Sequence, residues 1–182
     1  MKNSVGGVEL SSMAKGFETT DAMLKAAPVE ILLARTMCPG KYCVIVMGDV
    51  ANVRAAVEAG VDKAAEAHVD HFIIPNLDPD IFPALSAVNI PGKLEALGIV
   101  ETFSIASLIE AADAAVKSAN IRLIEIRLAM ALGGKAFVSF TGSVADCVTA
   151  AEAAAQSAGA KGLLVQKVVI PQPRPELLTE LV

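Results

Sequence analysis

Residues 6–35 read GGVELSSMAKGFETTDAMLKAAPVEILLAR, and residues 98–127 read GIVETFSIASLIEAADAAVKSANIRLIEIR. Aligned at an offset of 92, the two stretches share eleven identical residues, from Gly6 and Gly98 to Arg35 and Arg127. Self-similarity at a fixed spacing is the signature of a duplicated structural unit. We therefore expect the chain to contain two copies of one small domain.

The similarity continues beyond these stretches, with small changes of offset where the second copy is longer. Further matched positions are Gly40 with Gly134 at an offset of 94, and Ile74 with Ile170 at an offset of 96. Pro91-Gly92 supplies a turn between the copies, where the apolar pattern lapses. We predict a first domain over residues 1–90 and a second over residues 91–182.

Each copy shows the same order of hydrophobic patterns. The predicted strands are 7–10, 29–36, 41–47 and 69–74 in the first copy, and 98–102, 121–128, 136–141 and 162–170 in the second. One helix follows the first strand of each copy, capped by Ser12 or Ser104. The other helices are predicted at 50–67 and 144–157. This order predicts an α+β protein of two tandem ferredoxin-like domains, each a sheet with helices on one face.

Composition excludes several classes of function. The chain has 182 residues, of which 54% are hydrophobic, enough for a real core. The net charge is -5 and the 15 Lys and Arg residues are scattered, so we expect no nucleic-acid partner. No stretch approaches the roughly 20 apolar residues of a membrane span, and the start lacks a signal peptide's apolar run. These features predict a cytoplasmic protein without membrane contact.

Several separated motifs carry a family resemblance. They are Gly98-Ile99-Val100-Glu101-Thr102, the Ala-Ala-Asp-Ala-Ala-Val-Lys run at 111–117, their first-copy matches at 7–10 and 20–27, and Gly48-Asp49-Val50. In this order and present twice, they resemble the bacterial microcompartment shell domain, or BMC domain. The resemblance implies a structural shell tile and not an enzyme. Because single-domain members form hexamers, a fused pair is expected to form a homotrimer, a pseudo-hexameric disc in contact with other shell proteins.

The resemblance also assigns residues to the edge of the tile. Lys25 and Lys117 match the edge lysine at the end of the family's first helix. The alternative is a solvated lysine favoured by the helix dipole. The family's Pro-Arg-Pro-His segment is not kept, because Asn76 and Gln172 stand at the arginine position and Arg174 follows two residues after the latter.

The two copies differ in the loop between their paired hairpin strands. By resemblance these pore-loop residues surround the central axis of the disc: Met37, Cys38, Pro39 and Gly40 from the first copy, and Met130, Ala131, Leu132, Gly133 and Gly134 from the second. The Thr-Met-Cys-Pro-Gly-Lys stretch at 36–41 is similar to the iron–sulfur tandem shell proteins of propanediol-utilisation microcompartments. That similarity implies one 4Fe–4S cluster per trimer, with Cys38 as metal ligand, and electron transfer across the shell toward an encapsulated redox enzyme. Three cysteines leave the fourth iron to another ligand.

Other interpretations of the loop stay open. A lone cysteine is usually a small buried hydrophobe, and three thiolates can hold zinc as well as iron. The main alternative function is a shell tile without a cluster, whose centre is a narrow metabolite pore. A trimeric ferredoxin-like regulator that binds an effector between subunits is a further alternative, although it would need a long ligand loop.

Two pairs of polar residues resemble catalytic or metal sites. We interpret Glu9 and Glu101 as a repeated structural hydrogen bond, because they stand at matched positions without a nucleophile or base. His68 and His71 are expected to be solvated and not to share a face, because they straddle the end of a helix and the start of a strand. Cys43 and Cys147 are expected in the core.

Overall fold

The computed structural model describes residues 4–86, 94–128, 133–174 and 176–177. The chain forms two compact units. The first comprises residues 1–77 together with 104–106 and 129–134, and the second comprises the rest. The predicted domain boundary at 90/91 lies outside the described residues.

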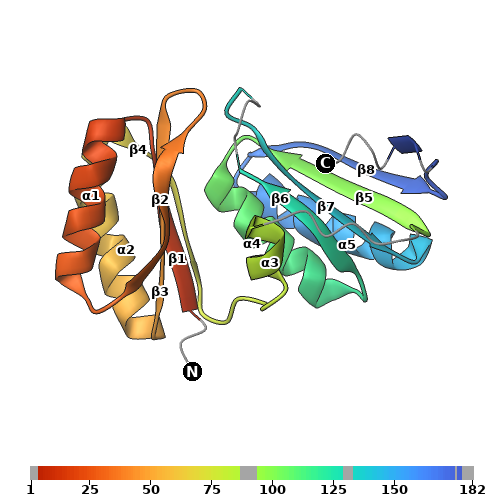
Figure 1. The fold of residues 1–182 in the computed structure, drawn as a ribbon, viewed down its shortest axis with the longest axis horizontal. Coiled ribbons are helices and arrows are strands. Elements are labelled where there is room, and N and C mark those ends of the chain that lie inside the picture. Colours follow the sequence, from red (N-terminus) through yellow and green to blue (C-terminus); the bar gives the residue numbers. More distant parts are fainter. Residues whose placement is uncertain (1–3, 87–93, 129–132, 175, 178–182) are drawn as a thin grey trace. The chain divides into compact units, whose positions relative to one another are not determined.

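The first unit contains one antiparallel sheet and two helices. Its elements are β1 (Ser4–Leu10), α1 (Met13–Ala26), β2 (Glu30–Met37), β3 (Lys41–Gly48), α2 (Val50–Ala64) and β4 (His68–Ile74), with a 3-10 turn at Ala65–Ala67. The strand order is β2-β3-β1-β4. Helices α1 and α2 pack against each other and on one face of the sheet (Figure 1). This confirms the ferredoxin-like prediction for the first copy.

The second unit repeats the arrangement. Its elements are α3 (Ile81–Ser86), β5 (Ala96–Thr102), α4 (Ile105–Ser118), β6 (Arg122–Arg127), β7 (Ala136–Gly142), α5 (Val144–Ala160) and β8 (Leu164–Pro171). The strand order β6-β7-β5-β8 matches that of the first unit, and α5 packs across β5, β7 and β8. Among the helices in the described parts of the chain, none is long and apolar enough to cross a membrane.

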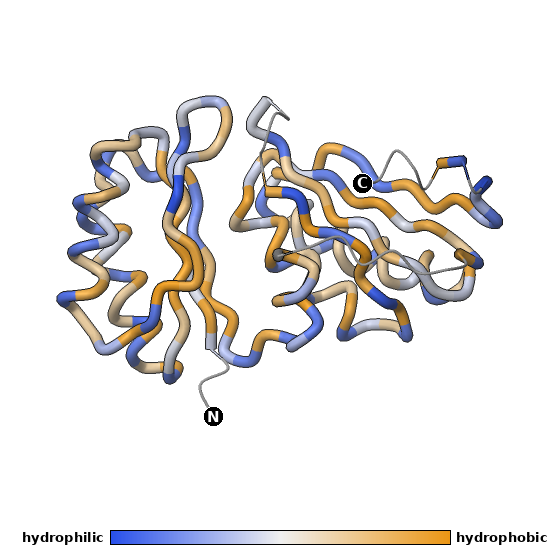
Figure 2. The backbone as a smooth tube through the Cα atoms, viewed as in Figure 1, coloured by the Kyte–Doolittle hydropathy of each residue, from blue (hydrophilic) through white to orange (hydrophobic). Residues whose placement is uncertain are grey.

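The alternation of side chains along β1 sets the two faces of the first sheet. Val8 and Leu10 are fully buried in a cluster that includes Met23 of α1 and Val53 of α2. Glu9, between them in sequence, therefore faces away from the helices. Figure 2 shows long hydrophobic stretches along the strands, whereas α1 is mixed. One face of the sheet thus holds the helix core, and the other remains available for Glu9.

Helix ends explain where the observed elements differ from the predicted ones. Ser12 caps α1 as predicted, because its hydroxyl accepts from the Lys15 amide at 3.3 Å. Helix α2 ends at Ala64, three residues before the predicted end, where Ala65 takes a φ of 47°. Strand β8 begins two residues late, because Gly162 turns the chain with a φ of 69°. Helix α3 was not predicted, and it packs against β6 in the second unit.

Candidate functional site

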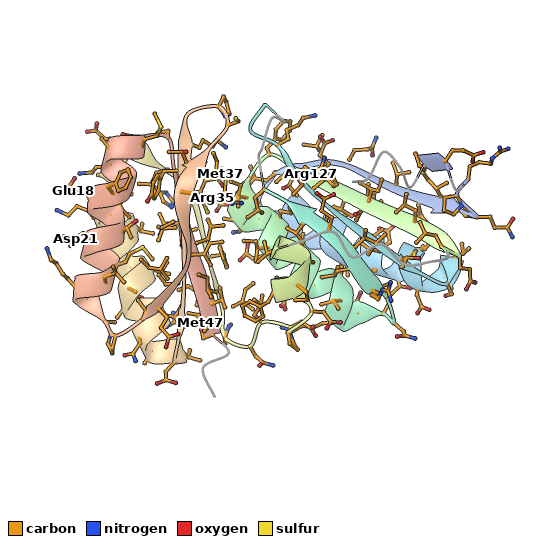
Figure 3. The ribbon with its side chains drawn as sticks, in the orientation of Figure 1. Glu18, Asp21, Arg35, Met37, Met47 and Arg127 are labelled. Carbon is orange, nitrogen blue, oxygen red and sulfur yellow. The ribbon has the colours of Figure 1, made fainter. Side chains whose placement is uncertain are left out.

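The turn between β2 and β3 exposes one thiol. Met37 ends β2 and is 4% exposed, so this pore-loop candidate belongs to the core of the single chain. Cys38, Pro39 and Gly40 follow it and are all exposed. Gly40 has a φ of 77°, a conformation that glycine adopts without steric cost. Figure 3 shows Met37 and Arg35 at the end of β2 that leads into this turn.

Part of the second copy's loop lies close to the loop of the first copy. Gly133 and Gly134, with φ angles of 59° and 87°, belong to the same compact unit as Cys38. A Cβ added to Gly134 would lie 2.8 Å from Cδ of Pro39, closer than two carbon atoms approach without strain. Because Gly134 has no side chain, it leaves room for the ring of Pro39, and the structure brings these two candidate residues together. The other candidates, Met130, Ala131 and Leu132, lie outside the described residues.

The remaining cysteines are buried, as predicted. Cys43 on β3 is 1% exposed and Cys147 on α5 is 0% exposed. Burial is the main cause that raises the pKa of both thiols, and nearby Glu9 raises that of Cys43 further. A thiolate is disfavoured at both positions, so Cys38 is the thiol that this chain can offer to a metal or an oxidant. Within the described ranges, no three His, Cys, Asp or Glu side chains are grouped to hold a metal ion.

The predicted edge lysines form matched ion pairs. Lys25 lies 2.5 Å from Asp21, and Lys117 lies 2.6 Å from Asp113, one helical turn earlier in each case. Figure 3 shows Asp21 on α1, on the side away from the sheet. The pairs hold both lysines at the ends of their helices, where a positive charge is favourable. Their role at a tile edge stays a prediction.

Glu9 has a larger structural role than its sequence position indicated. The Lys41 ammonium binds its Oε1 at 2.8 Å, and the matched pair Lys135 and Glu101 is 2.7 Å apart, which confirms the repeated interaction. Oε2 of Glu9 also accepts from the backbone N–H of Ile105 at 2.8 Å, the first residue of α4. No local motif indicates this contact, because it joins residues 96 positions apart.

The prediction that His68 and His71 do not share a face is wrong. Nε2 of His68 and Nδ1 of His71 are 3.1 Å apart. Leu10 pairs with His68 but Glu9 pairs with Asp70, so β4 carries one extra residue there. Such a bulge changes the alternation and brings residues three apart to the same side. Partial burial, and then the charge of His71, lower the pKa of His68.

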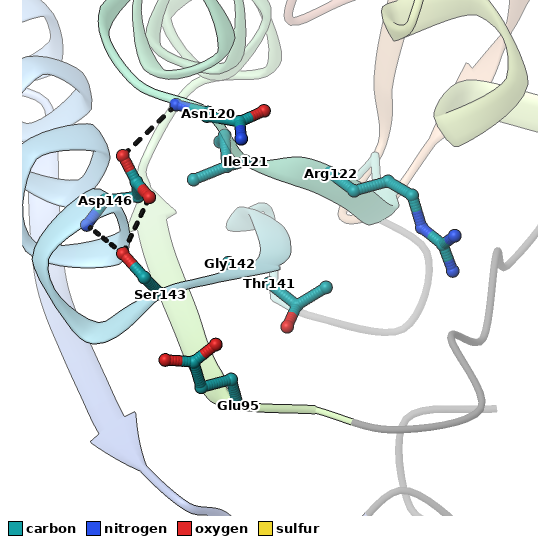
Figure 4. A pocket seen from close by; sticks show the side chains of 8 residues that line it. All are labelled: Glu95, Asn120, Ile121, Arg122, Thr141, Gly142, Ser143 and Asp146. Atoms are coloured by element: carbon teal, nitrogen blue, oxygen red, sulfur yellow. Dashed lines mark hydrogen bonds between the residues drawn. The ribbon is translucent and has the colours of Figure 1, made fainter.

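An open pocket of about 470 Å³ lies in the second unit, beside the N-terminus of α5 (Figure 4). The Asp146 carboxylate accepts from the Ser143 hydroxyl at 2.6 Å and from the Asn120 amide at 3.4 Å. Ser143 in turn accepts from the Asp146 amide at 3.1 Å as the helix cap. These polar groups therefore serve the start of α5 and carry no ligand assignment.

Known proteins match both copies of the fold, and the match extends over the whole length of the chain. The BMC domain family matches residues 4–77 and again residues 96–173. The bacterial microcompartment shell protein PduT of Citrobacter freundii is 42% identical over 182 residues, which are all of this chain and 99% of that protein. A microcompartment protein of Desulfitobacterium hafniense has a crystal structure with a TM-score of 0.85 and 49% identity, covering 97% of this chain and 98% of that one. A fused permuted hexameric shell protein, 22% identical with a TM-score of 0.65 over 86% of this chain and 83% of its own, shares the fold.

The chain therefore belongs to the BMC-domain family, with two tandem copies. It is a structural microcompartment shell protein, similar over its whole length to PduT.

Proposed function

We propose that this chain is a homotrimeric shell tile in which three Cys38 thiols bind one 4Fe–4S cluster. The observation that carries the proposal is the exposure of Cys38 in a glycine-containing turn, while Cys43 and Cys147 are buried with raised pKa values. One chain thus contributes one thiol. Three chains around a threefold axis would contribute three.

The residues around Cys38 fit such a group. Cluster iron is usually held by cysteine thiolates, and Cys38 is placed to reach a ligand outside its own chain. Pro39 and Gly40 keep the turn short, and Gly134 lets the neighbouring loop approach it. The fourth iron would need a ligand other than Cys38. A bound cluster would supply one-electron transfer, and its position at the centre of a tile would suit transfer across the shell, toward an encapsulated redox enzyme.

The trimer and its shell location are supported by the duplication and by the relatives. Each chain carries two complete BMC domains, so three chains supply the six domains of a pseudo-hexamer. The relatives include EutM of Salmonella typhimurium, a shell protein of which 85% aligns to 84 residues of this chain. We accordingly expect the trimer to pack beside other shell proteins in the wall of a microcompartment, and to have no enzymatic activity of its own.

The cluster is tested by anaerobic purification, with iron, zinc and sulfide analysis and electron paramagnetic resonance of the reduced protein. We expect about four iron and four sulfide per trimer. Cys38→Ser should remove the signal and leave the trimer intact, whereas Cys147→Ala should keep both. Zinc in place of iron would contradict the cluster. Protein without metal would favour the alternative tile, whose centre is a metabolite pore.

A further inference from the structure

The bulge in β4 brings together the two histidines of this chain, His68 and His71. Nε2 of His68 lies 3.1 Å from Nδ1 of His71. The ring centroids are 5.1 Å apart, farther than the two nitrogens, so both nitrogens lie on the facing edges of the rings. Because an imidazole nitrogen is the commonest protein ligand of a transition metal, this pair is a candidate metal site.

The separation of the two nitrogens fits one shared ion. A divalent metal lies about 2.0 to 2.1 Å from a histidine nitrogen, and neighbouring ligands subtend about 90° to 110° at the ion. Two nitrogens bound to the same ion are therefore about 2.9 to 3.4 Å apart. The nitrogens of His68 and His71 fall inside this range, so an ion between them would need little movement of either ring.

The first strand holds the backbone of this pair. His68 pairs with Leu10 and His71 pairs with Val8 across β1 and β4. Directly opposed residues lie on the same face of a sheet, so both rings project on the side of Val8 and Leu10, toward the helices. The carbonyl of Ala67, just before the pair, accepts a backbone hydrogen bond at 2.8 Å from the residue that follows β1. The two rings are thus anchored on the sheet.

A hollow of about 250 Å³ lies beside His71, between β4 and α2. It is lined by Glu58 and Asp62, one helical turn apart on α2, and by Arg54, so its charged groups other than the imidazole sum to a negative charge. Among the described residues, no third His, Cys, Asp or Glu is grouped with the pair as a direct ligand. The hollow has room for several waters of a bound ion, through which these carboxylates would act.

The second copy carries a permanent cation at the matched position. His71 matches Lys167 at an offset of 96, and the bulge occurs there too. Glu58 matches Glu152 at an offset of 94. The Lys167 ammonium forms an ion pair with the Glu152 carboxylate. The first copy keeps the carboxylate and has an imidazole in place of the ammonium, so a bound metal ion would restore the positive charge.

We infer that His68 and His71 together bind one divalent transition-metal ion of the zinc, nickel and copper group. His68 binds through Nε2 and His71 through Nδ1, and water or a ligand from outside the chain takes the remaining positions. Metals bind the neutral imidazole, and partial burial lowers the pKa of His68, which favours that form. The site goes beyond the proposed function, because it requires neither the trimer nor the cluster.

The test uses the full chain without a purification tag and with Cys38→Ser, which removes the exposed thiol that would compete for zinc. Calorimetric titration with Zn²⁺ at pH 7.5 should show one ion bound per chain. Proton NMR should show the ring signals of both histidines shifting together, and these are the only imidazole signals of the chain. With Cu²⁺, electron paramagnetic resonance should show splitting from two nitrogens.

Single variants in this background separate the ligands from their neighbours. His68→Gln and His71→Gln should each weaken zinc binding about a hundredfold or more, since loss of a group that only orients a ligand already costs about 10- to 100-fold. Glu58→Gln should weaken it about tenfold, and Glu152→Gln, the matched control, should bind as the parent does. Thermal unfolding shows that each variant is folded, and zinc should raise the midpoint of the parent but not of the histidine variants.

Three results would overturn the site. They are a Cys38→Ser chain that binds no zinc, a titration in which one ring signal shifts without the other, and zinc binding that His71→Gln leaves unchanged. The contact between His68 and His71 would then be a hydrogen bond between two imidazoles. None of these results bears on the cluster, because the titrated chain lacks the Cys38 thiol.

Discussion

Replacing Gly16 by alanine has two opposing effects on the stability of the fold, and their sizes can be compared. Alanine favours a helix over glycine by about 1 kcal/mol, so an open site on α1 would gain stability. Gly16, however, is buried against Tyr42 of β3. A Cβ there would lie 2.2 Å from Cγ and 2.6 Å from Cβ of Tyr42, where carbon atoms normally keep about 3.5 Å.

The clash should outweigh the gain. The added Cβ would meet Cβ, Cγ and Cδ1 of Tyr42, the side-chain atoms closest to the backbone. Tyr42 is 2% exposed in a central strand, so its ring cannot move aside. Overpacking of this kind costs about 1 to 3 kcal/mol, and the short distance puts Gly16→Ala near the upper end. We expect a net loss of about 2 kcal/mol and a midpoint roughly 4 to 8 °C lower.

Thermal unfolding at one fixed protein concentration measures this difference, because association makes the midpoint depend on concentration. Gly159→Ala on α5 is the control, since nothing lies within 4 Å of its added Cβ, and it should raise the midpoint. The second copy places Leu108 and Ala136 where the first has Gly16 and Tyr42. Gly16→Leu with Tyr42→Ala should therefore lose less stability than the sum of the single changes. A Gly16→Ala protein as stable as Gly159→Ala would refute the reasoning.

Three further predictions concern the thiols, the histidines and the helix-end lysines. In native protein freed of metal, a thiol reagent should modify one cysteine per chain, Cys38, and after unfolding in denaturant it should modify all three. Rapid modification of Cys43 or Cys147 in native protein would contradict their burial. The pKa of His68 is lowered in the folded state, so the unfolded chain binds more protons below about pH 6.5 and stability should fall as the pH drops through that value. His68→Gln should flatten this fall in urea titrations at pH 7.5 and 5.5, and an unchanged slope would count against it. Lys25→Ala should cost less than about 1 kcal/mol in urea unfolding, because its ion pair with Asp21 is exposed, yet disrupt extended sheets in electron micrographs. Sheets that remain intact in this variant would contradict the assignment of Lys25 to the tile edge.

The repeat made most of the fold predictable. Every strand was expected within a few residues, as were helices α2 and α5, and a helix was expected after the first strand of each copy. Apolar periodicity in one copy could be checked against the other. Helix α3 was missed for a physical reason: its six residues, IFPALS, contain a proline and are too few to show helical periodicity. Its position is fixed by packing against β6, which local sequence does not encode.

The candidate site was predictable in residue type but not in arrangement. The sequence placed Cys38 in a loop beside Pro39 and Gly40 and left a buried thiol open as an alternative, and in the structure the thiol is exposed. That Gly134 lies against Pro39 depends on two loops far apart in sequence. The bulge that joins His68 to His71 depends likewise on the pairing register of β4, which one extra residue changes.

Duplication within one chain allows the loops of the two copies to differ, which a single domain repeated six times does not allow. Six identical domains around an axis must present six identical loops, so a thiol placed at the tip would occur six times. Here Glu9 and Glu101 form the same ion pair in both copies, with Lys41 and Lys135 respectively. The loops are free to differ, and the second-copy loop that corresponds to that of Cys38 contains no cysteine. The proposed trimer would therefore gather three thiols at its axis, where six identical domains would gather six.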